Sequence, residues 1–260
     1  SDDTFNIIEK YAKKHDNIKA QKNAKNLGIL KNFAATLQRC SGEYVFDLAG
    51  DDWLSNDYAL QILVDALDKN PNYSFVDSGY DVFFEYRNKK KTFFNKKILN
   101  KSTYAEYVQT IGSPTLGCCF RKNDLDKFVD FKHYIELGFT IEDYPILTDL
   151  TQNCMYGFVH ESLVTYRIHQ TSYSSNFHDF LEIKMFFAKK YGYSKEAISK
   201  IHENYYHTKL VNASVYFKSK EGKIAIKNLR KKTLLHYALY LSSQYRLLYK
   251  TLWVLRKVSF

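Results

Sequence analysis

The sequence predicts an α/β fold in which helices flank a mixed sheet and a helical C-terminal region follows. Helical and strand patterns alternate from residue 1 to about residue 80, and strand patterns recur as far as residue 168. Beyond residue 177 the strand signal disappears, and the remaining segments show helical periodicity with many Tyr, Leu and Lys residues. The chain has 260 residues, 45% of them hydrophobic, and is therefore long enough to bury a substantial core.

The first third of the chain is expected to alternate helices with strands. The predicted elements, in chain order, are a helix at 3–15, a strand at 18–21, a helix at 28–39, a strand at 43–48, a helix at 56–68 and a strand at 73–76. Asn56 is expected to cap the last of these helices. The apolar residues expected on one face of that helix are Leu60, Leu63, Val64 and Leu67.

The middle of the chain is expected to extend the sheet. The predicted strands lie at 81–86, 92–94, 116–120, 156–160 and 163–168, with a lysine-rich turn at 89–91 and helices at 103–110 and from 140–143 to about 152. A boundary near residue 175 would separate a sheet-containing domain at 1–175 from a helical region at 176–260 with a basic amphipathic end.

The net charge of +10 and the sequence pI near 9.2 indicate an anionic partner. Charge alone leaves open a nucleic acid, an acidic membrane surface and a phosphorylated small molecule. A nucleic-acid-binding module is disfavoured, because the chain has no recognised motif of that kind and its cations lie away from the aromatic strands. P-loop and dinucleotide-binding folds also lose support, since neither a Walker-type loop nor a GxGxxG fingerprint occurs.

Cysteine content and hydropathy favour a cytoplasmic protein. The four cysteines include no CxxC pair, and we interpret them as reduced core residues. No apolar run reaches the roughly 18 residues that a membrane span requires. No signal peptide is visible either.

The strongest local motif is Gly50-Asp51-Asp52, which directly follows an apolar strand. Carboxylates at the carboxyl end of a strand in an α/β sheet lie where ligands bind. Their hard oxygens suit Mg or Mn, and such an ion can bridge a diphosphate. The alternative is an ordinary chain-reversing turn, for which Gly and Asp are equally suitable.

A second acidic motif, Glu142-Asp143, opens a predicted helix. A carboxylate here can act as a general base that removes a proton from an incoming hydroxyl, a role that contributes about 100- to 10,000-fold. The alternative is capping of the helix N-terminus by acids that complement its dipole.

Three basic residues could complete such a site. His169 ends a strand, and its imidazole can join carboxylates around Mn, while Arg167 can pair with phosphate. Lys31 lies in a helix preceded by Gly28, an arrangement that presents backbone amides and a cation to phosphate. The alternatives are a structural histidine and an ordinary helix start.

Five motifs, taken in order, resemble those of family 2 glycosyltransferases. They are NLGILKNF at 26–33, GEYV at 42–45, LAGDDW at 48–53, IEDY at 141–144 and YRIHQTS at 166–172. The resemblance is collinear over roughly residues 1–175. Each motif is weak singly, but five in the same order argue against coincidence.

The resemblance implies a GT-A fold that binds a nucleotide-diphosphate sugar and transfers the sugar to an acceptor hydroxyl with inversion at the anomeric carbon. It implies Asp51 at the metal-binding end of a DxD motif, with His169 completing a site for Mn or Mg. It also implies Asp143 as the catalytic base and Glu142 as support for the acceptor. The residues that it assigns to the donor are Lys31, Gly50, Asp51, Asp52 and Arg167.

Two features depart from the family pattern. Ala49 stands where the first Asp of DxD is usual, and Asp47 would lie roughly 6.6 Å further down a regular strand, too deep to substitute. The family's first strand, first helix and second strand would precede Ser1, so we expect the natural N-terminus to be missing. These departures suggest an alternative, a non-catalytic protein on this scaffold that binds nucleotide sugars or glycans.

The end of the chain has the pattern of a basic amphipathic helix at 233–257. Such a helix can lie in an anionic membrane interface, which suits a lipid-linked acceptor and a peripheral location on the inner face of the plasma membrane. The alternative is a helix packed on the catalytic domain with a solvated basic side. The expected pathway is the synthesis of a bacterial surface polysaccharide, with a glycan or lipid-linked acceptor.

Overall fold

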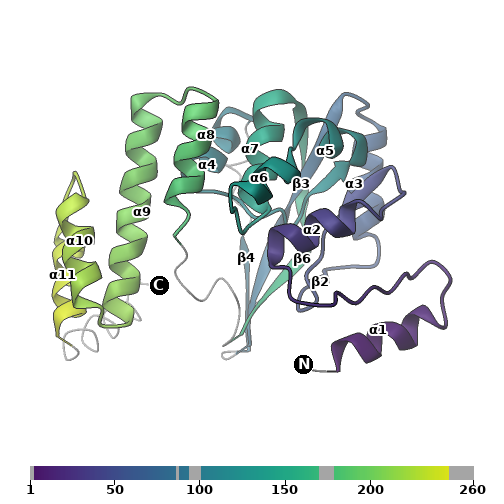
Figure 1. The fold of residues 1–260 in the computed structure, drawn as a ribbon, viewed down its shortest axis with the longest axis horizontal. Coiled ribbons are helices and arrows are strands. Elements are labelled where there is room, and N and C mark those ends of the chain that lie inside the picture. Colours follow the sequence, from purple (N-terminus) through teal and green to yellow (C-terminus); the bar gives the residue numbers. More distant parts are fainter. Residues whose placement is uncertain (1–2, 86–87, 94–100, 170–178, 246–260) are drawn as a thin grey trace. The chain divides into compact units, whose positions relative to one another are not determined.

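The computed structural model describes residues 3–85, 88–93, 101–169 and 179–245 (Figure 1). Its internal contacts divide the chain into two compact units. Unit 1 comprises Ser1–Cys40 and Phe131–Glu142, and unit 2 comprises Ser41–Asp130 and Asp143–Phe260. The boundary expected near residue 175 lies outside the described residues, so the division into 1–175 and 176–260 stays a prediction.

Helices make up all of the regular structure described in unit 1 and much of that in unit 2. The helices of unit 1 are α1 (Thr4–Ala12), α2 (Ile29–Leu37) and α6 (Phe131–Glu136). Those of unit 2 are α3 (Ala59–Asp68), α4 (Lys101–Thr110), α5 (Lys122–Phe128), α7 (Asp143–Asn153), α8 (Leu181–Lys190), α9 (Lys195–Val215), α10 (Ser219–Asn228) and α11 (Leu234–Gln244). The helical C-terminal region predicted from the sequence is thus confirmed.

Unit 2 is built on one mixed sheet, as the sequence predicted. Its strands are β1 (Tyr44–Phe46), β2 (Trp53–Leu54), β3 (Tyr73–Phe84), β4 (Lys89–Phe93), β5 (Cys119–Arg121) and β6 (Met155–Ile168). The strand order is β1-β5-β3-β6-β2, and β4 pairs with the later part of β3. The two long central strands, β3 and β6, run parallel, and the other pairs are antiparallel.

Each long central strand joins two strands that the sequence predicted separately. In β3 the predicted break falls at Asp77 and Ser78, which are polar but buried within the strand. In β6 it falls at Glu161 and Ser162, beside a bulge at which the register with β3 skips the exposed residues His160 and Glu161. A bulge of this kind leaves residues outside the pairing without ending the strand.

Aromatic and aliphatic side chains cover the two faces of the sheet. On one face, Leu63 and Leu67 of α3 pack with Val76, Val159 and Leu163 from the central strands. On the other face, the residues in ring contact with Tyr104 of α4 are Phe75, Tyr156 and Phe158, with centroids 5.1–6.5 Å apart. The large rings give β3 and β6 a rigid support, because aromatic pairs add to the burial of apolar area.

Some local predictions are wrong. Residues 18–21 form no strand, and the short apolar pattern there lacks a pairing partner in the described chain. Residues 89–91 lie in β4 rather than in a turn, because β3 supplies a partner strand. Lys90 Nζ also forms an ion pair with Asp81 Oδ2 at 2.5 Å. Leu60 is 44% exposed, so the buried face of α3 is narrower than predicted.

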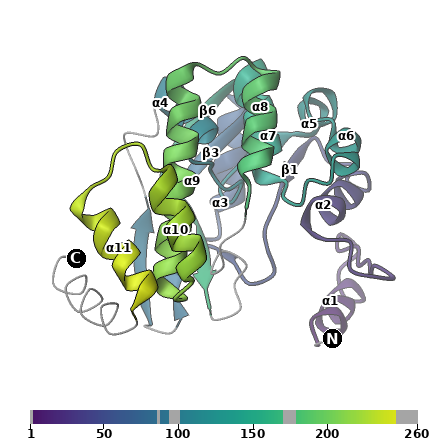
Figure 2. The same cartoon turned by 60° about the vertical axis from the view of Figure 1, so that its left-hand side comes forward.

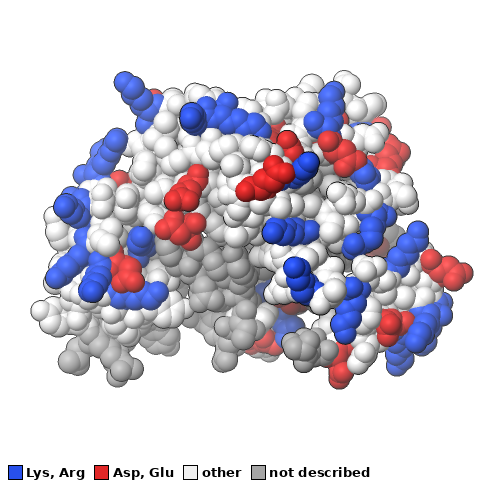
Figure 3. All heavy atoms as spheres, in the orientation of Figure 1, with Lys and Arg blue, Asp and Glu red and all other residues white. Residues whose placement is uncertain are grey.

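The last three helices pack side by side (Figure 2). A small core of Leu210, Ala225 and Leu229 joins α9 to α10. Toward the sheet, α9 meets α4 through an ion pair between Lys200 and Glu106. Lys and Arg side chains gather over α9, α10 and α11 (Figure 3). The predicted helix at 233–257 is described only as far as Gln244, and residues 246–260 lie outside the description.

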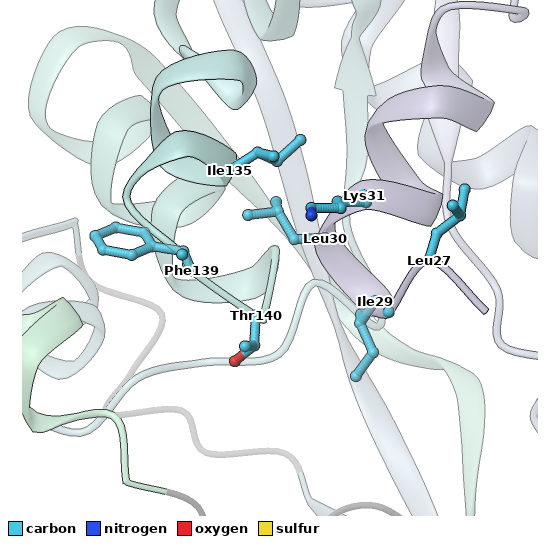
Figure 4. A pocket seen from close by; sticks show the side chains of 9 residues that line it. Leu27, Ile29, Leu30, Lys31, Ile135, Phe139 and Thr140 are labelled. Carbon is cyan, nitrogen blue, oxygen red and sulfur yellow. The ribbon is translucent and has the colours of Figure 1, made fainter. Parts of the chain in front are cut away.

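Unit 1 contains an apolar cavity of about 190 Å³ (Figure 4). Gly28 begins α2 with a φ of 75°, a conformation that side chains with a Cβ rarely adopt. The ring of Phe33 on α2 contacts Phe131 of α6 at a centroid distance of 5.6 Å.

Two predictions about the whole chain can be compared with the described residues. All four cysteines are free: Cys118 and Cys119 are buried, while Cys40 and Cys154 are half-buried. Among the helices that the structure describes, none is both long and apolar enough to cross a membrane.

Candidate functional site

The short strand β2 determines where the Gly50-Asp51-Asp52 motif lies. It pairs antiparallel with β6, Trp53 opposite Thr165 and Leu54 opposite Val164, and the Ser55 amide donates to the Leu163 carbonyl at 2.9 Å. Antiparallel pairing runs the two chains in opposite directions. The residues just before β2 therefore lie beside the residues at the end of β6.

Asp52 is tied directly to the end of β6. The backbone amide of Arg167 donates to Asp52 Oδ1 at 2.9 Å, and the Asp52 amide donates to the Ala49 carbonyl at 3.1 Å around Gly50. Burial, with a smaller contribution from the charges of Asp51 and Asp47, raises the pKa of Asp52 to about 6 against the opposing hydrogen bond from Arg167. Asp52 is thus held in place by a hydrogen bond, while its burial disfavours the ionised form of the carboxyl group.

Asp51 and His169 form the most exposed part of this cluster. His169 Nε2 lies 2.9 Å from Asp51 Oδ2, and both side chains remain partly open to solvent. The Arg167 guanidinium points to Glu85, with 2.5 Å between Nη2 and Oε1. The end of β6 therefore presents an imidazole and a guanidinium beside the acidic turn.

Asp143 is the first residue of α7 and is held by a loop residue. Asp143 Oδ1 accepts two hydrogen bonds from Thr115, one from the backbone amide at 2.9 Å and one from the hydroxyl at 2.6 Å. Burial raises the pKa of Asp143, and the two Thr115 donors oppose the rise. A buried carboxylate with a raised pKa is a stronger proton acceptor than an exposed one.

Asp47 is the residue that sequence reasoning set aside. It follows the end of β1 and is therefore free of the regular strand spacing on which its exclusion rested. Burial raises the pKa of Asp47, and the charge of Asp143 raises it further, while Asp47 in turn raises the pKa of Asp52. Asp47 thus links the acidic turn electrostatically to Asp143.

The donor set at Asp51 and His169 fits a divalent cation. Two ligand atoms at right angles around an ion, each about 2.1 Å from it, lie roughly 3 Å apart. The 2.9 Å between Asp51 Oδ2 and His169 Nε2 matches that spacing. The described residues contain no group of three or more His, Cys, Asp or Glu side chains that could hold a metal ion.

The structure brings together most, though not all, of the residues predicted for the site. Unit 2 contains Gly50, Asp51, Asp52, Asp143, Arg167 and His169. Lys31 and Glu142 belong to unit 1, where Lys31 lines the apolar cavity (Figure 4) and Glu142 is buried. Sequence reasoning missed Thr115, because no local pattern marks a loop threonine as the partner of an acid 28 residues away.

Comparisons with known proteins identify the family domain and the fold. Residues 1–128 match the family described as glycosyl transferase family 2. Among solved structures, the chain is similar to the 1–349 fragment of S. aureus TarS in complex with UDP-GlcNAc, with a TM-score of 0.54 and 14% identity over 94% of this chain and 67% of that one. No curated protein gives a significant match.

Two further TarS structures give the same result. The fragment alone has a TM-score of 0.55 and 13% identity, over 93% of this chain and 74% of the fragment. The fragment in complex with UDP has a TM-score of 0.55 and 13% identity, over 94% and 75%. The chain thus has a GT-A fold, and its residues 1–128 match the glycosyl transferase family 2 domain, which makes it an enzyme of glycosyl transfer.

Proposed function

We propose that this enzyme moves a sugar from a nucleotide-diphosphate sugar to an acceptor hydroxyl with inversion at the anomeric carbon. The observation that carries the proposal is the pairing of a fixed buried carboxylate, Asp143, with an acidic turn at the sheet edge. Inversion in one step needs a base for the acceptor and stabilisation for the leaving diphosphate, and no covalent intermediate.

Asp143 is proposed as the base. Its orientation is set by the two Thr115 donors, so the carboxylate has no need to reorganise when the acceptor hydroxyl arrives. Its raised pKa strengthens it as a proton acceptor. Glu142, the residue before it in the chain, is proposed to support the acceptor.

Asp51 and His169 are proposed to hold Mn or Mg, and Asp52 and Gly50 to shape the turn around the donor. A divalent cation bound there supplies positive charge that offsets the charge of the departing diphosphate. Arg167 would add a guanidinium for phosphate, exchanging part of its ion pair with Glu85. Lys31 is proposed as a further cation on the donor side.

The donor and acceptor are proposed from chemistry and likeness. The similar TarS structures were solved with UDP-GlcNAc and with UDP, which makes UDP-sugars the first donors to test. A glycan or lipid-linked acceptor in bacterial surface polysaccharide synthesis is proposed from the family. We also propose a cytoplasmic location, peripheral to the plasma membrane.

Release of nucleoside diphosphate from a panel of UDP-sugars, with and without Mn, tests the proposal. We expect Mn-dependent release by the wild type and its near loss in Asp143→Asn and Asp51→Ala. NMR of the transferred sugar should show the opposite anomeric configuration from the donor. Equal release by all three proteins, or retention of configuration, would contradict the assignment.

A further inference from the structure

Helix α11 carries large apolar side chains on its outer side as well as on its inner side. Leu239 and Tyr240 pack on the small core of α9 and α10, beside the buried Ser242 and Ser243. Other large side chains point outward, and the exposed fractions are 89% for Leu234, 49% for Tyr237, 45% for Leu241 and 61% for Tyr245, the residue after the helix. A helix packed on a protein core in water normally has polar residues on its outer side.

The buried serines are fully accommodated within the helical layer. Ser242 Oγ donates to the Ala238 carbonyl at 2.8 Å and Ser243 Oγ to the Tyr240 carbonyl at 2.6 Å, so both hydroxyls are satisfied locally. Gly222 of α10 faces Ser243, and a Cβ on Gly222 would lie 2.2 Å from Ser243 Oγ. Small residues on both sides therefore let α10 and α11 approach closely.

The outward residues of α11 form one continuous stripe. Residues 234, 237, 241 and 245 are spaced by three, four and four positions, which places them on one side of a helix. No Lys, Arg, Asp or Glu occurs within Leu234–Gln244. Thr233 caps the helix by accepting from the His236 amide, so the stripe begins at a fixed point.

The segment that precedes α11 is rich in cations. Residues 216–245 contain seven Lys and Arg residues and one acid, Glu221. On α10 the exposed residues Lys220, Lys223 and Lys227 recur at helical spacing on one face, and residues 230–232 before α11 are all basic and exposed. Figure 3 shows Lys and Arg side chains along the side of the molecule on which α10 lies.

We propose that the exposed face of α11, with the lysine face of α10, is a docking surface for a bilayer that contains anionic lipids. At 11 residues, α11 is too short to span a bilayer and would lie along its surface, with Leu and Tyr in the interface and cations at the headgroups. A second copy of the chain fits the surface less well, because two such faces would bring their cations together. This inference rests on the peripheral membrane location proposed above and names the surface that would contact the membrane.

Vesicle co-sedimentation of the full chain, without donor or metal, tests the surface independently of sugar transfer. The probes are phosphatidylcholine vesicles with and without phosphatidylglycerol. We expect binding to the anionic vesicles that falls as salt rises. Leu234→Ser combined with Leu241→Ser should weaken it by about tenfold for each leucine.

The chain offers a matched control on another helix. Leu60 of α3 is 44% exposed, against 45% for Leu241, so Leu60→Ser removes an equally exposed leucine away from the surface. It should bind like the wild type. A second variant, Lys223→Glu with Lys227→Glu, should lose the preference for anionic vesicles while leaving the leucines intact.

Three results would overturn the proposal. The first is no binding of the wild type to anionic vesicles. The second is equal binding by the wild type and the double-leucine variant. The third is a dimer in analytical ultracentrifugation that the leucine variant converts to a monomer without any vesicle binding, since a second copy would then cover α11.

Discussion

In most proteins acids are exposed and large apolar side chains are buried. The acidic edge of the sheet and the C-terminal helices of unit 2 depart from this rule in different ways. The sheet edge buries carboxylates, and α11 exposes leucines and tyrosines. At the sheet edge each described site acid has a donor or cation nearby, such as Thr115 for Asp143 and His169 for Asp51. At α11 the outward side chains have no such compensation within the described chain.

This difference indicates two kinds of function. Burial of an ionised acid lowers the stability of the folded protein, and buried acids are therefore retained mainly at sites that use them for chemistry. Exposure of an apolar stripe costs solubility, and such stripes persist where another surface covers them. The sheet edge therefore suits catalysis and the helical layer suits docking, and substitutions in each should change one property and spare the other.

The largest effect is expected for Asp143→Asn. The amide oxygen can still accept from Thr115, so the loop stays in place while the base is lost. We expect kcat to fall about 100- to 10,000-fold, as for removal of a general base. Nucleoside diphosphate release measures it. Asp65→Asn, a half-buried acid on α3, is the control and should leave kcat unchanged; a normal kcat in Asp143→Asn would assign the base elsewhere.

Asp51→Ala should lower activity about a hundredfold, the size of losing one electrostatic stabiliser of the transition state. It should also raise the Mn concentration needed for half-maximal activity, because His169 would lose its neighbouring ligand. A titration of activity against Mn measures both effects. An unchanged half-maximal Mn concentration would remove Asp51 from the metal site.

Gly222→Val should act on the helical layer alone. The added Cβ would approach Ser243 Oγ to 2.2 Å, and overpacking of this kind costs about 1–3 kcal/mol of the free energy of unfolding. Urea denaturation measures the loss, and Ser243→Gly in the same chain should recover part of it. At a temperature where the protein stays folded, kcat should not change; a kcat loss as large as that of Asp51→Ala would couple the two regions.

Thr115→Val should lower kcat about tenfold by removing one donor to Asp143 while keeping the side-chain volume. Because this hydrogen bond lowers the pKa of Asp143, its loss raises that pKa further. The base must be ionised to act, so the acidic limb of the pH profile should move to higher pH. Thr148→Val, a buried threonine later in α7, should leave the limb where it is in the wild type.

The smallest effect concerns stability and Asp52. Its folded pKa of about 6 exceeds the ordinary value, so the folded state keeps a proton that the unfolded state has released between about pH 4 and 6. The contribution of Asp52 to stability is therefore present at low pH and lost as pH rises through 6. Asp52→Asn should flatten this part of the stability curve by about 1 kcal/mol, allowing for solvent screening. Urea denaturation at several pH values measures it, and an unchanged slope would contradict the raised pKa.

Local patterns predicted the elements whose formation depends on neighbouring residues. The alternation of helices and strands, the helical C-terminal region and the acidic motifs after β1 and before α7 were all visible in the sequence. Predictions failed where a distant partner decided the outcome. The strand at 18–21 did not form, whereas the lysine-rich segment at 89–91 became β4 beside β3.

The sequence by itself determined which residues could do chemistry, because Asp, Glu and His follow strands or open helices at recognisable positions. Only the tertiary structure decided that Asp143 is held by Thr115 and that Asp51 meets His169, 118 residues away. Periodicity gave α11 its apolar residues, but the packing of Leu239 and Tyr240 on α9 and α10, with Ser243 against Gly222, decided which of them stay exposed. The physical reason is common to these cases. A sequence pattern determines which residues share a face of a helix or strand, and contacts between distant segments determine what each face packs against.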